Sequence, residues 1–436
     1  MPICCEFLTI ATCIMMTSMY NESAPAVKDL YVKNIASKGL AKPYLFWGSI
    51  VLLLLPGLVH AYLLMPFPGS QNLNAITVCY YLEKIVTPLR VLGGLLIVWY
   101  AIFYLKDNNR RGKIVKASVL ALCLISFYFS DFKFQAERMF QEPQAMKFAN
   151  FINNSVPEST VIIGVVSNGV AKAYPLNYLG YHHKIQDNVG GQPVLVTYCT
   201  MCRSGRVYNP IVNGKRQNFR LVGARHYNAV IEDEGTKTWW YQASGKAAVG
   251  LLQGSQLQEI PYEQSSLAVW ISKHPGSLIL QPDHHYLNDY NDLKNYDRLQ
   301  AVDKDSTLKN KDTLIRKSWV VGLVISGQAK AYDWRRLFKK RFVNDSLNKT
   351  NLLLTLEKDS ITYHSFNTTV NGKVLHFNLD KSGQLIDVET ASLWDWDGLS
   401  TAGVLKGSRL TKVQSYQEYW HSWKYFHPNT LFWKQL

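Results

Sequence analysis

Two cysteines separated by two residues form the motif whose chemistry is easiest to name. They are Cys199 and Cys202, in the segment Cys-Thr-Met-Cys. This spacing brings two sulfur atoms onto one side of a tight turn, which suits a redox disulfide or a pair of soft-metal ligands. His182 could add an imidazole ligand, and His226 and the thioether of Met201 are weaker candidates. Such ligands suit copper or zinc.

The second half of the chain repeats the first, and the comparison singles out the cysteines. Residues 164–174 (GVVSNGVAKAY) return as residues 322–332 (GLVISGQAKAY), and other segments recur at the same offset. Similarity at a fixed period is typical of duplicated structural units. In the second half, Glu357 and Ser360 stand where the cysteines are, and a lysine replaces His182. We interpret the second half as a degenerate copy that has lost functional side chains.

Three functions fit these residues. In the first, Cys199, Cys202 and His182 bind copper or zinc, although zinc usually takes four ligands. In the second, the cysteines cycle between dithiol and disulfide, with His182 stabilising the thiolate. In the third, the protein is a non-catalytic binding module with a groove between the copies, and the cysteines are incidental. Whether the protein is an enzyme stays open.

The residues after the motif indicate whether metal binding or redox chemistry is favoured. In thioredoxin-like proteins the C-x-x-C motif opens a helix, whose N-terminus stabilises the thiolate. Residues 203–210 instead have the pattern of a strand that leads to a hairpin at Asn213-Gly214. Because no activating helix is expected, we place metal binding slightly ahead of redox chemistry. Neither G-x-S-x-G nor H-E-x-x-H occurs, which disfavours a hydrolase.

Three apolar runs predict transmembrane helices at residues 45–64, 86–105 and 114–130, since about 20 apolar residues span a bilayer. The loop of residues 66–83 contains no Lys or Arg. Basic residues precede the first run and fill the loop between the second and third: Lys28, Lys33, Lys38, Lys42, Lys106, Arg110, Arg111 and Lys113. The positive-inside rule therefore places the chain after about Asp131 outside the cytoplasm. We expect a multi-pass protein of the inner (cytoplasmic) membrane, with lipid as its partner.

Charge and cysteine content narrow the class of protein further. The net charge of +15 is spread along the 436 residues, which indicates a solvated, lysine-rich surface, and no nucleic-acid-binding module is recognisable. A protein or small-molecule partner is not specified. Outside the motif, the cysteines lie in apolar segments or in the first loop: Cys4, Cys5, Cys13, Cys79 and Cys123. A disulfide-stapled scaffold is therefore excluded for the C-terminal body.

Short β-rich runs separated by turn residues predict a mostly β body. The Asn-Gly pairs at residues 168–169 and 213–214 are strong hairpin signals. Residues 263–273 have helical spacing and end at His274-Pro275-Gly276. The second copy repeats this order. The predicted fold class is therefore α+β, with three N-terminal transmembrane helices followed by a duplicated, mostly β extracytoplasmic body.

The expected segments follow from these patterns. They are an N-terminal cytoplasmic or interfacial segment (1–43), a membrane region (44–131), a connector (132–159), the first copy with C-x-x-C (160–285), a linker (286–317) and the degenerate second copy (318–436).

Several motifs between residues 161 and 280 also occur together in a known family. They are Lys172-Ala-Tyr-Pro175, His182 with Asp187, Gly190-Gly191, residues 193–202, residues 233–242 and His274-Pro-Gly276. In these motifs the chain resembles the bacterial family catalogued as domain of unknown function 3179. The resemblance implies that some positions are characteristic: His182, both cysteines, Asp187, Asn228, Trp240 and Gln242.

The chain departs from the family pattern at two places. Family members usually have Pro-Leu between the cysteines, where this chain has Thr200-Met201. They usually have Asn-Ser where this chain has His226-Tyr227. The resemblance implies no activity, but members are often exported or membrane-anchored.

Overall fold

The computed structural model describes residues 41–104, 109–294, 296, 314 and 316–433. Residues 1–40 of the expected N-terminal segment, Lys106 and most of the expected linker lie outside the described residues. The chain divides into two compact units, one of residues 1–56 and 87–125 and the other of residues 57–86 and 126–436.

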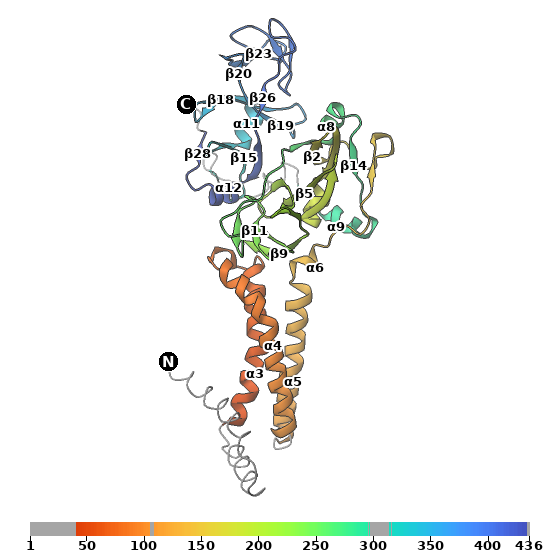
Figure 1. The fold of residues 1–436 in the computed structure, drawn as a ribbon, viewed down its shortest axis with the longest axis vertical. Helices are drawn as coiled ribbons and strands as arrows, with labels where there is room; N and C mark the ends of the chain where they lie inside the picture. Colours follow the sequence, from red (N-terminus) through yellow and green to blue (C-terminus); the bar gives the residue numbers. More distant parts are fainter. Residues whose placement is uncertain (1–40, 105–108, 295, 297–313, 315, 434–436) are drawn as a thin grey trace. The chain divides into compact units, whose positions relative to one another are not determined.

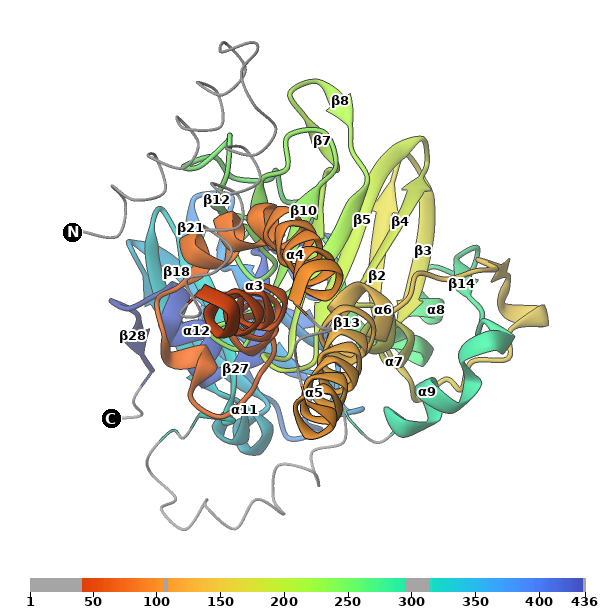
Figure 2. The same ribbon diagram turned by 90° about the horizontal axis from the view of Figure 1, so that it is seen from below.

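The three apolar runs form three long helices, α3 (Ala41–Leu64), α4 (Ile76–Tyr104) and α5 (Arg110–Tyr128). All three are long and apolar enough to cross a membrane. Helix α4 begins earlier than the sequence predicted, so Cys79 lies within a helix and not in a loop. Figure 2 shows the three helices side by side and nearly end-on.

In the first unit, one small cluster of side chains joins these helices. It is made of Phe46, Ile50, Tyr100 and Cys123. Other faces of the helices expose large apolar side chains, and Leu124 is 71% exposed. An exposed apolar surface of this extent marks a membrane or protein contact.

A short helical and extended segment leads from α5 into the β body. It contains a single π-helical turn (Phe129–Lys133), α6 (Ala136–Met139), β1 (Phe148–Ala149) and a 3-10 turn (Phe151–Asn153). In this segment, which the sequence predicted to be a connector, β1 pairs with a strand from the far end of the first half, β14 (Leu278–Leu280). The connector is thus part of a sheet.

The N-terminal β unit (residues 161–280) contains three sheets, ordered β1-β14-β3-β2-β13, β4-β5-β6 and β12-β11-β10-β9, and the hairpin β7-β8. Figure 1 labels its main elements. Their bounds are β2 (Val161–Ser167), β3 (Val170–Pro175), α7 (Leu176–His182), β4 (Lys184–Val189), β5 (Gln192–Cys199), β6 (Ser204–Tyr208), β7 (Ile211–Val212), β8 (Lys215–Arg216), β9 (Phe219–Arg225), β10 (Asn228–Asp233), β11 (Trp239–Tyr241), β12 (Ala247–Val249), β13 (Glu263–Ser266) and α8 (Leu267–Lys273).

Between this unit and the next, the structure describes a 3-10 turn (His284–Tyr286) and α9 (Leu287–Asp292). The sequence predicted a linker or long loop here. The difference arises because Tyr286 and Tyr290 are buried against the N-terminal β unit. This part of the segment therefore belongs to the core.

The C-terminal β unit (residues 319–432) has its elements in the same order. They are β15 (Trp319–Ile325), β16 (Gln328–Asp333), α11 (Trp334–Lys340), β17 (Phe342–Leu347), β18 (Thr350–Leu356), β19 (Tyr363–Asn367), β20 (Thr369–Val370), β21 (Lys373–Val374), β22 (Phe377–Leu379), β23 (Leu385–Asp387), β24 (Leu393–Trp394), β25 (Ser400–Ala402), β26 (Thr411–Lys412), β27 (Ser415–Tyr419), α12 (Trp420–Phe426) and β28 (Leu431–Phe432).

Matching positions in the two β units make matching contacts. The Tyr174 hydroxyl donates to Asp187 over 2.8 Å, and the Tyr332 hydroxyl donates to Asp345 over the same distance. Each unit also packs a tryptophan against a strand glycine, Gly164 in one and Gly322 in the other. The shared order of elements therefore extends to individual side chains.

The local predictions are mostly confirmed. Asn168 and Gly169 have φ values of 47° and 78° and join β2 to β3, as an Asn-Gly hairpin requires. The helix predicted from residue 263 instead begins at Leu267. Residues 263–266 pair with β2, and Ser266 caps the helix by accepting the Val269 N–H.

We predict that Gly164→Ala destabilises the protein by about 1–3 kcal/mol or more, because an added Cβ would lie 2.3 Å from the Trp270 ring. The matched control is Gly276→Ala, whose added Cβ meets nothing within 4 Å. Chemical denaturation of the detergent-solubilised protein measures both. Equal stability of the two variants would contradict the close packing.

Candidate functional site

The two cysteines lie at a tight turn between two paired strands. Cys199 ends β5, Ser204 begins β6, and these two residues are paired across the ladder. Within the turn Arg203 adopts a left-handed conformation, with φ 54°. Both cysteines are free thiols and fully buried. The predicted strand after the motif is thus confirmed, and no helix starts at Cys202.

Backbone amides surround the sulfur of Cys199. Burial by itself raises the pKa of this thiol, but hydrogen bonds from the Cys202 side chain and from the N–H groups of Cys202, Ala229 and Met201 outweigh it. The net effect lowers the pKa of Cys199 below its ordinary value. The turn thus stabilises a thiolate without a helix N-terminus.

The pKa of Cys202 is shifted in the opposite direction. Burial and the neighbouring Cys199 both raise the pKa of Cys202 well above its ordinary value. Its sulfur accepts from Asn228 Nδ2 over 2.9 Å and lies 3.0 Å from Ser204 Oγ. The Ser204 hydroxyl donates to Gln242 Oε1 over 2.7 Å. Its hydrogen bond with Cys202 lowers the pKa of that thiol, but burial and the neighbouring Cys199 outweigh this effect. Cys202 is therefore the thiol of the pair that keeps its proton.

The buried amide of Gln242 fixes this arrangement. Its Nε2 donates to Thr197 Oγ1 and to the Ser204 carbonyl, over 2.9 and 3.0 Å. Asn228 is held in turn by the Ala243 N–H, which donates to Asn228 Oδ1. These contacts give Asn228 and Gln242 a direct role at the thiols.

Two other positions that the resemblance implied have structural contacts. Asp187 accepts from Lys172 and Tyr174, each over 2.8 Å. The indole N–H of Trp240 donates to Asp233 over 2.9 Å, and the ring is buried. Both sets of contacts hold strands together and do not involve the sulfurs.

His182 does not join the thiols. Its Nδ1 contacts the Gln141 carbonyl and its Nε2 lies 2.6 Å from the Tyr290 hydroxyl, so both ring nitrogens are engaged by the protein. His226 lies at the β9–β10 turn, where its ring stacks on Tyr425 at 4.2 Å. Met201 packs against the cluster that contains both cysteines. Of these three candidates, Met201 packs at the cysteines, and His226 precedes Tyr227, whose carbonyl lies 4.0 Å from Cys199 Sγ.

The described residues form two groups of three or more His, Cys, Asp or Glu ligand atoms, and neither includes a cysteine. One group is Asp283, His284 and His285, where both histidines are exposed. The other is Glu263, His364 and Asp397, whose acidic members are paired with lysines, as Lys412 is with Glu263. Within the described part of the chain, the thiols thus have no third ligand of these types beside them.

The first loop contributes a side chain that sequence reasoning missed. Met65 belongs to the same buried cluster as Cys199 and Cys202. Gln71 Oε1 accepts the Tyr227 N–H over 3.2 Å, and the Tyr227 carbonyl lies 4.0 Å from Cys199 Sγ. The segment between α3 and α4 is therefore part of the wall around the thiols.

Arg225 holds this loop in place. Its fully buried guanidinium donates to the carbonyls of Leu63, Ser70 and Leu73. The repeat contained a signal for it, because the C-terminal half is shorter where residues 225–228 lie. The longer β9–β10 hairpin of the N-terminal unit carries both Arg225 and Asn228 to the thiols.

The C-terminal β unit holds the turn from the other side. The Tyr419 N–H donates to the Cys202 carbonyl over 2.9 Å. Arg203 Nη2 donates to Gln417 Oε1 over 3.0 Å, and Arg206 forms a buried ion pair with Glu418. Three consecutive residues of β27 thus form hydrogen bonds or an ion pair with the segment that contains Cys202.

A cavity of about 770 Å³ adjoins the turn. It is lined by Pro66, Thr200, Met201, Tyr227, Leu293, Tyr296, Arg316, Lys317, Tyr419 and His421. Because the two residues between the cysteines form part of its wall, a small molecule in this cavity would lie next to the motif.

We predict that Glu418→Gln lowers the free energy of unfolding by up to about 3–5 kcal/mol, because it leaves the buried Arg206 with only the more distant carboxylate of Glu259, 3.9 Å away. Glu234→Gln, at an exposed carboxylate of the same protein, should change it by less than about 0.5 kcal/mol. Denaturant titration of both variants tests this. A Glu418→Gln variant as stable as the control would show that the ion pair does not secure the turn.

Comparison with known proteins agrees with the resemblance seen in the motifs. No curated protein matches the chain, and no solved structure matches it. Residues 142–430 match the family described as Protein of unknown function (DUF3179), a match that runs through both β units. Since this covers more than half of the sequence, the chain belongs to that family.

Proposed function

We propose that Cys199 and Cys202 form a thiol–disulfide exchange site. The observation that carries this is the unequal environment of the two sulfurs. The Cys202 side chain and backbone N–H groups favour the thiolate of Cys199, whereas burial and the neighbouring Cys199 favour the protonated form of Cys202. A nucleophilic thiolate next to a protonated resolving thiol is the arrangement that exchange requires.

The reaction is a two-electron exchange with a disulfide substrate. Both sulfurs are fully buried, so the exchange requires the turn to open locally. The Cys199 thiolate then attacks one sulfur of the substrate, which forms a mixed disulfide and releases the first substrate thiolate. Cys202 then loses its proton and attacks Cys199 Sγ, which releases the second substrate thiolate. The released groups leave as two thiols, the protein gains a Cys199–Cys202 disulfide, and the reverse reaction reduces it.

The proposal reverses the order that the sequence suggested. Metal binding was favoured there because no helix follows the motif. The N–H groups of Met201 and Cys202 supply the same kind of stabilisation from within the turn. The absence of a helix is therefore no argument against a reactive thiolate.

The trapping variant is Cys202→Ser, made in a protein whose other cysteines, Cys4, Cys5, Cys13, Cys79 and Cys123, are alanine. We expect it to accumulate a mixed disulfide with an aromatic disulfide reagent, because no resolving thiol is present, while its serine keeps a donor near Cys199. The matched Cys199→Ser variant should react at least about tenfold more slowly, since its remaining thiol resists ionisation. Mass spectrometry and release of the coloured thiol measure both.

The rate of this trapping reaction should fall as the pH is lowered. A lowered pKa means that Cys199 is a thiolate over a wider range, so the rate falls only when acid protonates it. The apparent midpoint should therefore lie below about 8.5, the ordinary cysteine value. A midpoint at or above that value, or equal rates for the two serine variants, would refute the proposed roles.

Soft-metal binding remains the second candidate, favoured by the amide hydrogen bonds to Cys199 and by the thioether of Met201 near the motif. Thiolate and thioether ligands suit Cu(I), whereas a zinc site of four protein ligands would need more than the described residues supply here. Metal content and free thiols, measured on one sample of the full-length protein, separate the candidates. One bound metal per chain, with thiols protected until chelation, would favour this second function.

We further propose that the C-terminal β unit is a degenerate second copy, retained as a support for the motif. Its support is the common order of elements and the contacts of β27 with the turn. If the two β units are copies of one fold, Cys199 of the N-terminal unit and Glu357 of the C-terminal unit occupy the same position.

We also propose that both β units lie outside the cytoplasm, anchored in the inner membrane by α3, α4 and α5. The basic residues before α3 and at the start of α5 support this orientation. A phosphatase reporter that works only outside the cytoplasm should be active when fused after Leu436 and inactive when fused after Asn109. The opposite pattern would place the thiols in the cytoplasm.

A further inference from the structure

The cavity of about 770 Å³ beside the cysteine turn shares its wall with the surroundings of Cys199. Met201, which lines the cavity, donates its backbone N–H to the Cys199 sulfur. Tyr227, a second lining residue, has its carbonyl 4.0 Å from the same sulfur. Cavities of roughly 300–1,000 Å³ bind small molecules. A small molecule in this cavity would thus be separated from Cys199 by a single layer of residues.

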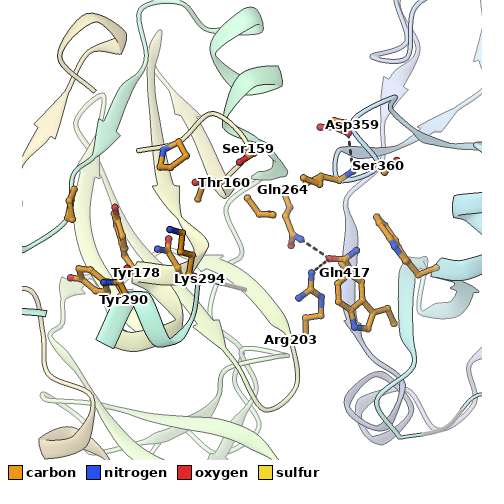
Figure 3. A pocket seen from close by; sticks show the side chains of 18 of the residues that line it. Ser159, Thr160, Tyr178, Arg203, Gln264, Tyr290, Lys294, Asp359, Ser360 and Gln417 are labelled. Atoms are coloured by element: carbon orange, nitrogen blue, oxygen red, sulfur yellow. Dashed lines mark hydrogen bonds between the residues drawn. The ribbon is translucent and has the colours of Figure 1, made fainter. Parts of the chain in front are cut away.

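The Arg203 end of the turn is held by buried hydrogen bonds. Arg203 Nη2 donates to Gln417 Oε1, which also accepts from Gln264 over 2.8 Å, and Figure 3 draws both contacts. All three side chains are buried and line a different cavity, of about 630 Å³. Thr200 and Met201 are partly exposed instead. We therefore expect the local opening that exchange requires to occur at these two residues, toward the cavity that they line.

The wall on this side is largely aromatic. Tyr227, Tyr296 and Tyr419 all line the cavity. The Tyr296 hydroxyl donates to the Thr200 carbonyl, so opening of the turn at Thr200 has to break this hydrogen bond. Tyrosine rings offer flat apolar surfaces with a polar edge, which suit the carbon chain of a small polar molecule.

The charge of the cavity favours an anion. Among the described residues that line it, Arg316 and Lys317 are cations and none is acidic, and both cations are exposed. The Arg316 guanidinium lies over the Tyr227 ring, with Cζ 4.2 Å from the ring centroid. Burial and, to a smaller extent, the charges of Arg316 and Lys317 lower the pKa of His421, another lining residue. The positive field therefore reaches into the cavity beside Cys199.

We propose that the substrate of Cys199 is a small disulfide whose two thiol halves carry carboxylate groups. This inference rests on the thiol–disulfide exchange proposed above. Arg316, whose paired N–H donors match a carboxylate, and Lys317 hold the acidic groups, while the tyrosine rings pack against the carbon chain. Attack by Cys199 binds one half of the substrate and releases the other as a thiolate. Cys202 then forms the protein disulfide and releases the bound half, so the substrate is reduced to two thiols.

Oxidation rates of the reduced, full-length, detergent-solubilised protein test the inference, in the cysteine background of the trapping variants but with Cys199 and Cys202 both kept. The probes are dithiodipropionate, bis(hydroxyethyl) disulfide and cystamine, which are anionic, neutral and cationic. Each rate is divided by the rate of N-acetylcysteinamide with the same probe, which corrects for the reactivity of the disulfide itself. We expect the corrected rate of the anionic probe to exceed that of the neutral probe about tenfold, and cystamine to be slowest, because two ion pairs form with the anion alone.

The double variant Arg316→Gln plus Lys317→Gln should lower the ratio of the anionic to the neutral rate about tenfold, because both ion pairs are lost. The matched control, Lys215→Gln plus Arg216→Gln, removes two charges from the exposed strand β8, outside the cavity, and should keep the ratio. Both rates come from one sample, so incomplete folding of a variant does not change their ratio.

The outcomes separate this inference from the exchange itself. Equal corrected rates for the three probes, or equal ratios in the two double variants, would overturn the carboxylate substrate and leave the exchange site in place. Failure of all three probes, while the aromatic reagent still traps Cys199, would also overturn it and favour a protein disulfide as substrate. If Cys199 reacts with no disulfide at all, both proposals are wrong.

Discussion

The buried ion pair between Arg206 and Glu418 is the contact on which the thiol site depends most. Arg206 lies on β6, directly after the turn, and Glu418 lies on β27 of the other β unit. An isolated charge in this interior would be unstable, so each partner requires the other to be in place. The flanking contacts of Gln417 and Tyr419 then fix Arg203 and the Cys202 carbonyl. The turn keeps its shape only while both units are assembled.

The two units use the same turn position for different purposes. In the N-terminal unit it carries Cys199 and a thiolate-stabilising set of amides. In the C-terminal unit Glu357 occupies that position and pairs with His364 over 2.8 Å and with Lys273 of the N-terminal unit over 3.2 Å. One turn has a buried thiol, and the other has a salt bridge between the units. The C-terminal unit thus contacts the N-terminal unit through this salt bridge.

The first loop is joined to the site by hydrogen bonds as well as by the apolar packing of Met65 and Phe67. Arg225 satisfies carbonyls of Leu63, Ser70 and Leu73 that a loop buried in the protein would otherwise leave without donors. This loop connects two helices that are long and apolar enough to cross a membrane.

Local patterns in the sequence determined several features. Asn-Gly pairs specified the hairpins because these turns require positive φ values, and the strand pattern that leads to Asn213-Gly214 predicted the strand after Cys202. Apolar runs predicted the three long helices, although α4 begins earlier than its apolar run suggested. Recurring motifs led to the family to which the chain belongs. Each of these features depends on neighbouring residues alone.

Only the tertiary structure decided which side chains surround the sulfurs. His182 has the right chemistry, but α7 turns its ring toward Gln141 and Tyr290. Ser204 and Asn228 contact Cys202 directly, and Gln242 acts through the Ser204 hydroxyl. The physical reason is that such contacts are set by how strands stack and pair across long sequence separations. Residue type and spacing located the thiols, and packing selected their partners.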